Sequence, residues 1–414
     1  MMKKTKMKRV PKLRFPEFTD DWEKRKLGDI SEIKTGPFGS ALHADDYVGD
    51  GVPIITTEHF KTGVLPQCKN GLPQVSDADY ERLTAYILED GDIVFSRVGS
   101  VDINAIITPY QSNWLFSGRV LRVRPKANIS SQFLHTRLET ESIKTDIRAR
   151  AVGQTMPSIN TEILKITPVV LPPSIVEQKQ IGLYFAHLDH LITLHQRKFK
   201  TLKKLKEGVM QKLFSQEVRF KADDGSDYPN WKTKKIGDVC TQIKETIDPM
   251  ANPKKLFVEY SMPAFDNEMK PEVVYGNTMN SIRKVIGSPC VLINKLNVRK
   301  RRIWNIVNPE DNAVCSAEFV PLTSEVMNLS FVAYFALTDW FTRYLLECST
   351  GSSNSQKRVT PDVILNIKMP IPCLAEQQKI VDCLSSLDHV IEKQKVTLAA
   401  WKELKKGLLQ QMFV

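Results

Sequence analysis

The sequence predicts an α+β protein with an internal pseudo-two-fold repeat: two small mixed α/β domains joined by two long antiparallel helices that form a coiled-coil spacer. Three observations support this fold. Residues 171–181 return in similar form at 371–380, and each copy opens a long run of periodic apolar residues. An Arg-Phe pair followed by Trp and by Leu-Gly-Asp-Ile or Ile-Gly-Asp-Val occurs at 14–30 and again at 219–239. The chain therefore repeats one order twice: a leader segment (14–30 and 219–239), a variable region that follows it, and a long helix.

Composition narrows the class of protein. The 414 residues can bury more than one core, and the formal net charge of +11 favours a polyanionic partner, although charge alone does not require one. The seven cysteines are scattered without metal-ligand spacing, which indicates reduced thiols and a cytoplasmic location. The basic segment 1–9 leads to Pro11 and not to an apolar signal core, and the apolar stretch 331–337 is too short to cross a membrane.

The first domain is expected over 12–170. Segments 52–56 and 91–97 are apolar runs bounded by Gly and Asp, which is typical of short strands. Segment 120–124 alternates apolar and basic residues, so it is a third strand. Residues 131–150 carry the pattern of a helix that closes the domain.

The central conserved helix is expected over 171–214. Ser174 and Glu177 form a capping box directly after two prolines, which is a strong helix start. A helix of about 38 residues would be about 57 Å long at 1.5 Å per residue. Its apolar residues recur with heptad-like spacing at Ile181, Tyr184, Phe185, Leu188, Leu191, Ile192, Phe199, Leu202, Leu205, Val209 and Leu213.

The second half repeats this order. A second domain with its own leader is expected over 215–370, with strands at 289–293 and 314–320 and a helix at 331–347, followed by the C-terminal conserved helix at 371–414. The kinds and order of elements agree between the halves while the residues of the variable regions differ. This combination indicates one scaffold that reads two different targets.

Each long helix needs a partner for its apolar stripe, and the other copy is the nearest candidate. If a two-fold axis relates the copies, the helices run antiparallel, and His195 and Gln394 fall near the middle at positions where the heptad requires an apolar residue. The two polar residues either fix the register of the coiled coil or point to solvent at a helix edge. The basic residues of the helices form either a solvated face or a DNA contact: Lys203, Lys204, Lys206, Lys402, Lys405 and Lys406.

Candidate DNA contacts are polar and basic residues in loops, because Lys and Arg bind phosphates and Arg, Asn and Gln pair with base edges. In the first domain they are Ser40, His43, Thr57, Glu58, Arg97, Ser100, Asn104 and Gln154. In the second domain they are Asn294, Lys295, Asn297, Arg299, Lys300, Arg301, Arg302, Ser353, Asn354, Gln356 and Lys357, of which 299–302 is the densest basic cluster.

Catalytic motifs are not found in the sequence. There is no phosphate-binding loop, no dinucleotide fingerprint and no amino-methyltransferase motif, and 36–40 is only a glycine-bearing turn. Residues 361–362 with 403–405 superficially suggest a nuclease site, but the second group lies on a helical apolar stripe. No catalytic, cofactor-binding or metal-binding residue is therefore predicted, which favours a binding subunit.

The chain resembles the specificity subunits of type I restriction-modification systems along essentially its whole length. The repeated helix starts at 171–181 and 371–380 carry this resemblance most specifically. It extends to the leader and to parts of the variable regions, at 12–18, 22–30, 36–40, 91–97 and 351–361.

The resemblance implies a target-recognition domain for each half of an asymmetric, interrupted DNA site, with the helices setting the gap. It also implies two modification subunits, which methylate adenine with S-adenosylmethionine, and two restriction subunits, which use ATP and Mg²⁺. No catalytic residue or cofactor is then expected on this chain. A self-contained DNA-cleaving restriction enzyme is the alternative, and the missing catalytic motifs disfavour it. An adaptor that binds only protein is a third hypothesis, and the basic cluster at 299–302 disfavours it.

Overall fold

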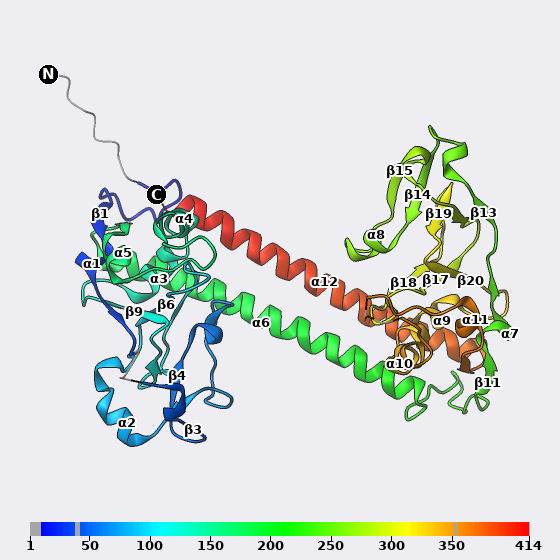
Figure 1. The fold of residues 1–414 in the computed structure, drawn as a ribbon, viewed down its shortest axis with the longest axis horizontal. Helices are drawn as coiled ribbons and strands as arrows, with labels where there is room; N and C mark the ends of the chain where they lie inside the picture. The colour runs from blue at the N-terminus through cyan, green and yellow to red at the C-terminus, as the bar shows by residue number, and fades with distance from the viewer. Residues whose placement is uncertain (1–9, 38–41, 352, 354, 414) are drawn as a thin grey trace. The chain divides into compact units, whose positions relative to one another are not determined.

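The computed structural model describes residues 10–37, 42–351, 353 and 355–413. The chain forms two compact units, one of Met1–Gln196 with Val396–Val414 and the other of Arg197–Lys395. The two long helices, α6 (Ile175–Phe214) and α12 (Leu374–Met412), contain 40 and 39 residues and each contributes to both units (Figure 1). Each unit is therefore built from one variable region and parts of both helices.

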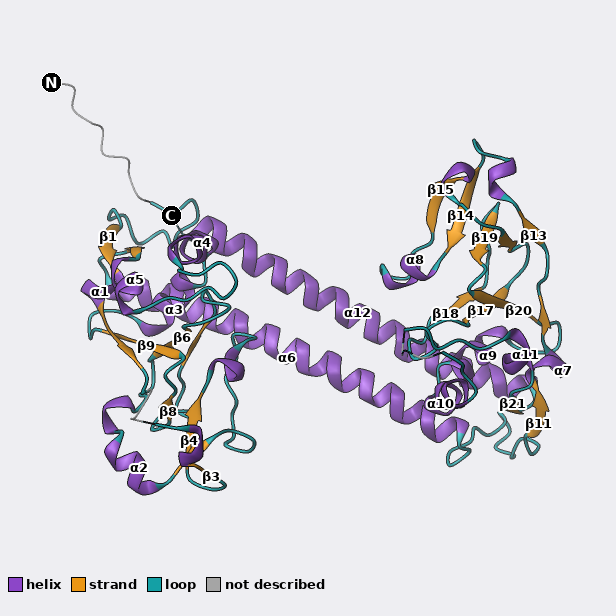
Figure 2. Ribbon diagram, in the orientation of Figure 1, coloured by secondary structure: helices purple, strands orange, loops and turns teal. Residues whose placement is uncertain are grey.

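The first unit is centred on a four-stranded antiparallel sheet of order β2-β9-β6-β7, with a second small sheet of order β3-β5-β4-β8 and a two-stranded ladder β1-β10. Figure 2 draws the strands in orange. Its elements are β1 (Glu23–Lys26), α1 (Leu27–Ile30), β2 (Ser31–Thr35), β3 (Tyr47–Val48), β4 (Val52–Ile55), β5 (Gln74–Val75), α2 (Asp77–Arg82), β6 (Ile93–Ser96), β7 (Asn104–Ile106), β8 (Leu115–Phe116), β9 (Val120–Pro125), α3 (Ser131–Leu138), α4 (Glu141–Arg150), α5 (Thr161–Ile166) and β10 (Pro168–Leu171).

The second unit repeats this plan with a four-stranded sheet of order β12-β20-β17-β18, a five-stranded sheet of order β13-β16-β19-β14-β15 and a ladder β11-β21. Its elements are β11 (Lys232–Lys235), α7 (Ile236–Val239), β12 (Thr241–Gln242), β13 (Thr246–Ile247), β14 (Leu256–Tyr260), α8 (Met262–Asp266), β15 (Glu272–Tyr275), β16 (Arg283–Val285), β17 (Cys290–Asn294), β18 (Ile303–Ile306), β19 (Ala313–Ser316), β20 (Phe319–Thr323), α9 (Leu329–Ala336), α10 (Asp339–Glu347), α11 (Pro361–Leu365) and β21 (Lys368–Ile371).

The central strand of each unit is buried on both faces. Successive side chains of a strand point to opposite sides, so Phe95 of β6 joins the core shared with α3 and α6 while Val94 joins the core beneath β8. In β17, Ile293 faces α9 and Leu292 faces the core with Trp304. A strand with two covered faces reads as a continuous apolar run, which is why both strands are visible in the sequence.

Two predicted elements are each divided in the structure. The helix expected over 131–150 is α3 followed by α4, and the helix expected over 331–347 is α9 followed by α10. At both breaks a threonine hydroxyl, of Thr140 and of Thr338, donates to a backbone carbonyl of the preceding helix at 2.7 Å. The prediction of a single strand over 314–320 is also wrong, because this segment forms parts of β19 and β20, which belong to different sheets.

The helix starts are tied to the leaders in the same way in both units. Glu177 accepts hydrogen bonds from Arg14 at 2.7 and 2.8 Å and from the Trp22 indole at 3.2 Å. In the second unit, Glu376 takes the corresponding place opposite a leader arginine and tryptophan. The repeated Arg, Trp and Glu of the sequence therefore form one repeated polar clamp.

The glutamine beside each clamp glutamate joins the helix start to the domain. Gln178 donates to the Pro172 carbonyl at 3.0 Å and accepts from the Ser130 amide at 3.0 Å. Gln377 donates to the Pro372 carbonyl at 3.0 Å and accepts from the backbone amide of Asn328 at 3.0 Å. Because Ser130 and Asn328 are the N-caps of α3 and α9, each glutamine positions the helix that covers the central sheet.

Within each unit the segments of α6 and α12 run antiparallel. In the first unit, Asp189 pairs with Lys405 at 2.7 Å, and Phe413, just beyond α12, packs against Phe185 near the start of α6, with ring centroids 5.7 Å apart. The second unit repeats the ion pair between Lys206 and Asp388 at 2.5 Å. The predicted antiparallel pairing is confirmed in both units.

For two of the six helix lysines, the prediction of a solvated helix face is wrong. The side chains of Lys206 and Lys405 are only 17% and 16% exposed, because both lie in the seam between the helices and the domain. Lys405 also pairs with Glu139 at 2.8 Å. Because burying an unpaired charge costs free energy, the buried ammonium group of Lys405 needs these carboxylate partners.

The two polar residues predicted for the helix centre are not simply solvated. Gln394 is buried, with 6% exposed, and His195 is half-buried with its ring centroid 6.1 Å from that of Trp401. Both side chains take part in interactions. Their role in setting the register stays a prediction.

Within the described residues, none of the helices combines the length and the apolar composition of a membrane span, and no cluster of His, Cys, Asp and Glu is arranged to hold a metal ion. Burial raises the pKa of the Cys240 thiol to about 11 and those of Cys290 and Cys315 to about 12. These three thiols are therefore kept protonated within the second unit.

Candidate nucleic-acid interface

The second unit brings two distant loops together at the end of its central strand. The amide of Asn297 donates to the Lys357 carbonyl at 2.7 Å, and the amide of Val359 donates to the Lys295 carbonyl at 3.0 Å. The second loop is closed by two hydrogen bonds of 2.9 Å between the backbones of Thr350 and Arg358. We call residues 295–302 with 350–358 the second loop pair.

The first unit contains the same arrangement. The amide of Gly99 donates to the Pro157 carbonyl at 2.8 Å, and the amide of Ile159 donates to the Arg97 carbonyl at 2.9 Å. Hydrogen bonds of 2.9 and 2.8 Å join Val152 and Ser158, which close the second loop. We call residues 97–103 with 152–158 the first loop pair, and its backbone frame matches that of the second.

The two frames also share their unusual backbone angles. Gly99 and Asn297, at the corner of the first loop in each pair, have φ of +81° and +52°. Gly153 and Gly351 open the second loop with φ of +99° and +121°. A Cβ at either glycine would lie within 2.8 Å of a carbonyl oxygen across the loop, so both loops require glycine there. The loops are held by the same constraints while the residues between them differ.

Most of the predicted contact residues gather in or beside these loop pairs. In the first unit these are Arg97, Ser100, Asn104 and Gln154, and in the second Asn294, Lys295, Asn297, Arg299, Lys300, Arg301, Arg302, Ser353, Gln356 and Lys357. Three predicted residues lie elsewhere, in segments flanking β3 and β4: His43, Thr57 and Glu58. Ser40 and Asn354 fall outside the described residues.

Several members of the basic cluster are engaged inside the second unit. Arg302 is buried and forms a two-point ion pair with Asp266, at 2.8 and 2.6 Å. Its hydrogen bonds lower the pKa of the Asp266 carboxyl to about 2. Lys300 approaches the same carboxylate at 3.3 Å, and Arg301 binds Asp339. Arg302 therefore has a structural role within the second unit, and its predicted DNA contact stays a prediction.

Asn294 also has a structural role, and its predicted DNA contact likewise stays a prediction. This buried side chain donates to the Leu296 carbonyl at 2.9 Å and accepts from the Arg302 amide at 3.1 Å, so it shapes the start of the loop. Arg299, by contrast, is exposed and makes no side-chain ion pair with the residues that the structure describes. Within 299–302, Arg299 is thus the cation best placed to meet an external anion.

The first loop pair divides its predicted residues differently. Ser100 and Gln154 are exposed, and Arg97 is half-buried and donates to the Gly118 carbonyl at 3.2 Å. Asn104 lies in β7, only 2% exposed, and neither its side-chain oxygen nor its nitrogen has a hydrogen-bond partner within the described part of the chain. Asn104 is therefore placed within the domain core and away from solvent.

The family assignment follows from comparison with known proteins. A family model described as the type I restriction modification DNA specificity domain matches residues 19–204 and 228–399, one match in each half of the repeat. The chain belongs to this family. Its members are the non-catalytic DNA-recognition subunits of type I restriction-modification systems, so the predicted absence of enzymatic activity is confirmed by the family and a self-contained nuclease is not favoured.

Individual relatives agree along the whole chain. A protein of Methanocaldococcus jannaschii named putative type I restriction enzyme MjaX specificity subunit is 26% identical over 95% of this chain and 93% of its own length. The MjaVIII specificity subunit of the same organism is 22% identical over 98% of this chain and 95% of its own. The crystal structure of the type I S subunit from M. genitalium superposes with a TM-score of 0.62 at 14% identity, covering 98% of this chain and 99% of that one.

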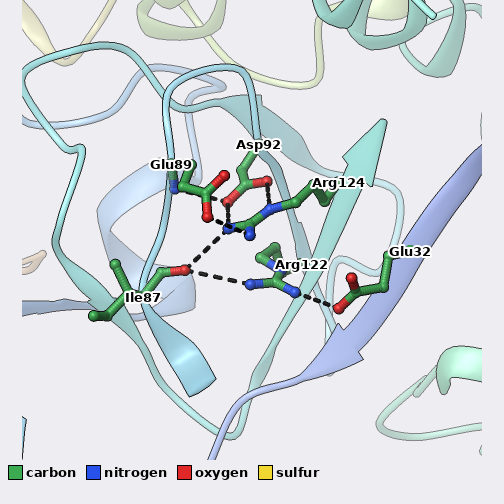
Figure 3. Close-up of polar contacts among 6 residues, drawn as sticks. All are labelled: Glu32, Ile87, Glu89, Asp92, Arg122 and Arg124. Atoms are coloured by element: carbon green, nitrogen blue, oxygen red, sulfur yellow. Dashed lines mark hydrogen bonds and ion pairs between the residues drawn. The ribbon is translucent and has the colours of Figure 1, made fainter. Parts of the chain in front are cut away.

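Sequence reasoning missed a charged network of this specificity domain at the far end of β6. Arg124 binds Asp92 through two hydrogen bonds of 2.7 Å, while Arg122 binds Glu32 at 2.6 Å and the Ile87 carbonyl at 3.3 Å. Figure 3 shows how these side chains lie. The bond to Asp92 raises the pKa of Arg124. The network fixes the start of the strand whose other end leads into the first loop pair. Alternating arginines in the predicted strand 120–124 were its only signal.

Two exposed apolar residues of the first loop pair were also missed. Val152 is 67% exposed and Met156 is 66% exposed, on either side of Gln154. Apolar residues in a short glycine-containing loop give no periodic signal, so only the structure reveals that both side chains are exposed beside the predicted glutamine.

Proposed function

We propose that this chain is the DNA-specificity subunit of a type I restriction-modification complex and that each unit reads one half of an asymmetric, bipartite target. The observation that carries the proposal is the repetition of one loop-pair frame with different side chains. The shared pattern of backbone hydrogen bonds supports the same mode of docking in both units, and the differing residues support recognition of different bases.

The long helices support a spacer role within this proposal. Because each helix belongs to both units and pairs antiparallel with the other in each, the helical stretch between the ion pairs sets how far apart the loop pairs are held. The gap between half-sites then depends on helix length, at 1.5 Å per residue. His195 and Gln394 are proposed to fix the register of that stretch.

The catalytic steps are proposed to lie in partner subunits. Two modification subunits would methylate adenine with S-adenosylmethionine, and two restriction subunits would use ATP and Mg²⁺, in the cytoplasm. A solved structure described in terms of complex assembly and conformational transition of the type I R-M system resembles this chain with a TM-score of 0.54 at 16% identity. The match covers 95% of this chain and 97% of that one, and it supports a multi-subunit assembly.

Methylome sequencing of cells with and without the gene tests the proposal. Loss of one bipartite adenine-methylation motif on deletion is the expected result, and an unchanged methylome would contradict it. Incubating the purified chain with DNA, Mg²⁺ and ATP tests the self-contained nuclease, for which cleavage without partners would be required.

A binding assay examines the role of the second loop pair. Arg299→Gln should weaken DNA binding and make the dependence of log affinity on log salt shallower by about one ion, because one phosphate contact is lost. Arg343→Gln, an exposed arginine of α10 outside the loop pair, is the matched control and should leave the slope unchanged. Equal slopes for all three proteins would exclude a phosphate contact by Arg299.

A further inference from the structure

Within the proposed function, we infer that the loop at 152–158 reads base pairs of the A·T type in the first half-site. Gln154 would pair with adenine in the major groove, and Val152 and Met156 would contact the methyl groups of thymine. The proposal assigns a base class to one half of the target.

The loop is built to present these three side chains. The two hydrogen bonds between Val152 and Ser158 close it, the Gly99–Pro157 hydrogen bond ties it to the neighbouring loop, and Gly153 provides a backbone angle that other residues rarely adopt. Gln154 is exposed between two apolar side chains that are each about two-thirds exposed. Apolar side chains exposed on a constrained loop add nothing to the core of the unit, and they are available to pack on an apolar group outside the chain.

The chemistry of the loop selects the base class. Residues 152–158 contain no charged side chain. Guanine is most often read by Arg or Lys, and the cytosine amino group by Asp or Glu, whereas Gln pairs bidentately with adenine and apolar groups pack on the thymine methyl. Of these interactions, the loop offers only the last two. A loop suited to a protein partner would expose the same apolar groups, so the two occupants are separated by experiment.

The corresponding loop of the second unit has a different character. It contains Lys357 and Arg358, and Arg358 forms an ion pair with Glu318 at 3.0 Å. Its polar and basic residues do not share the restriction to A·T contacts. The two loop pairs should therefore differ in base class as well as in sequence.

The test measures the methylated motif of the complete complex carrying variants of this chain. Gln154→Ala should reduce methylation of the cognate site by about tenfold and relax one A·T position of a single half-site, since one bidentate pair discriminates by that order. Gln154→Arg should shift the same position toward guanine. A new preference of this kind cannot arise from unfolding, which keeps the test valid if the alanine variant is unstable.

Two controls accompany the variants. Gln410→Ala changes another exposed glutamine, on α12, and should leave the motif intact, and Gln356→Ala should affect only the other half-site. If the wild-type complex produces no bipartite motif, the proposed function fails. If the motif exists and both Gln154 variants leave it unchanged, or if Met156→Ala instead weakens association with the modification subunit, the base assignment is overturned and the proposed function stands.

Discussion

Glu376 accepts two hydrogen bonds from the guanidinium of Arg219, with Nε–Oε1 at 3.1 Å and Nη2–Oε2 at 2.7 Å. The carboxylate is fully buried, and the indole of Trp231 donates to it at 2.9 Å. A buried carboxylate with three such donors anchors the leader to the first turn of α12. The pairing of Arg14 and Glu177 on α6 does the same in the other unit.

The clamp predicts a stability effect. Glu376→Ala should lower the free energy of unfolding by about 3 kcal/mol, because it leaves the donors of Arg219 and Trp231 without an acceptor inside the domain. Urea unfolding followed by fluorescence measures the change. Glu392→Ala, whose carboxylate pairs with Lys395 at an exposed site, is the control and should change stability by less than about 0.5 kcal/mol. Equal effects of the two variants would contradict a structural clamp.

The two helix ion pairs should differ in strength. Lys405→Met leaves two carboxylates without their cation, Glu139 and Asp189, and should cost about 3 kcal/mol of unfolding free energy. Lys206→Met should cost about 1 kcal/mol, because it leaves only one carboxylate without its cation, that of the half-exposed Asp388. Lys402→Met, at an exposed position of α12, is the matched control. The ranking is checked by urea unfolding, and a larger loss for Lys206→Met would refute it.

His135 predicts a dependence of stability on pH. Burial lowers the pKa of this imidazole, an effect that Lys405 and Lys144 reinforce and that Glu139 and Asp189 oppose. The folded chain thus keeps His135 neutral while the unfolded chain takes up a proton near pH 6.5. The contribution of the neutral His135 to the free energy of unfolding is therefore present above pH 6.5 and declines as the pH falls below that value.

Replacing the imidazole tests this dependence. His135→Leu should reduce the loss of unfolding free energy between pH 7.5 and pH 5, a range that lies above the usual pKa values of carboxyl groups. Measurements at the two pH values give the difference directly. His190→Leu changes an exposed histidine of α6 and should leave the pH dependence as it is. An unchanged slope in His135→Leu would mean that another group titrates in this range.

Helix length predicts the gap in the target. Deleting residues 194–200 and 393–399 removes one heptad from each helix while keeping all four members of the two ion pairs. At 1.5 Å per residue the helices shorten by about 10 Å, close to three base pairs of 3.4 Å each. Methylome sequencing should report a gap changed by about that amount, with both half-sites retained. An unchanged gap or altered half-sites would rule out the ruler.

Replacing the polar residues at the helix centre should affect the register in which α6 and α12 pair more than the stability of the chain. His195→Leu with Gln394→Leu should stabilise the helices and permit alternative registers, since polar residues at core positions specify pairing at some cost in free energy. Replacing Gln394 alone tests the buried member. A double variant that keeps a single gap length in the methylome, at unchanged stability, would assign no register role to either residue.

Sequence predicted the parts of this molecule that repeat or alternate. The clamp residues Arg14, Glu177 and their counterparts were visible because they recur, and β6 and β17 were visible as apolar runs. The breaks at Thr140 and Thr338 were not predicted, because a single threonine within an apolar pattern does not reveal that its hydroxyl will bond to the preceding turn.

The candidate interface was only partly predictable for a similar reason. Loop chemistry identified Gln154 and Arg299, but the backbone hydrogen bonds that assemble each loop pair join segments far apart in the chain. The ion pair of Arg302 with Asp266 is equally non-local, so the basic cluster looked uniformly available in the sequence. Burial separates its structural members from its exposed ones.

The placement of Phe413 has a consequence for how the chain folds during synthesis. Its ring packs with those of Trp22, Phe133 and Phe185, in a core otherwise built mostly from residues 22–188, which are synthesised more than 200 positions earlier. The unit of Arg197–Lys395 is continuous and can mature first on the ribosome. The N-terminal region, although translated earlier, must wait with an open core until α12 emerges, which makes that exposed surface the natural point for chaperone capture.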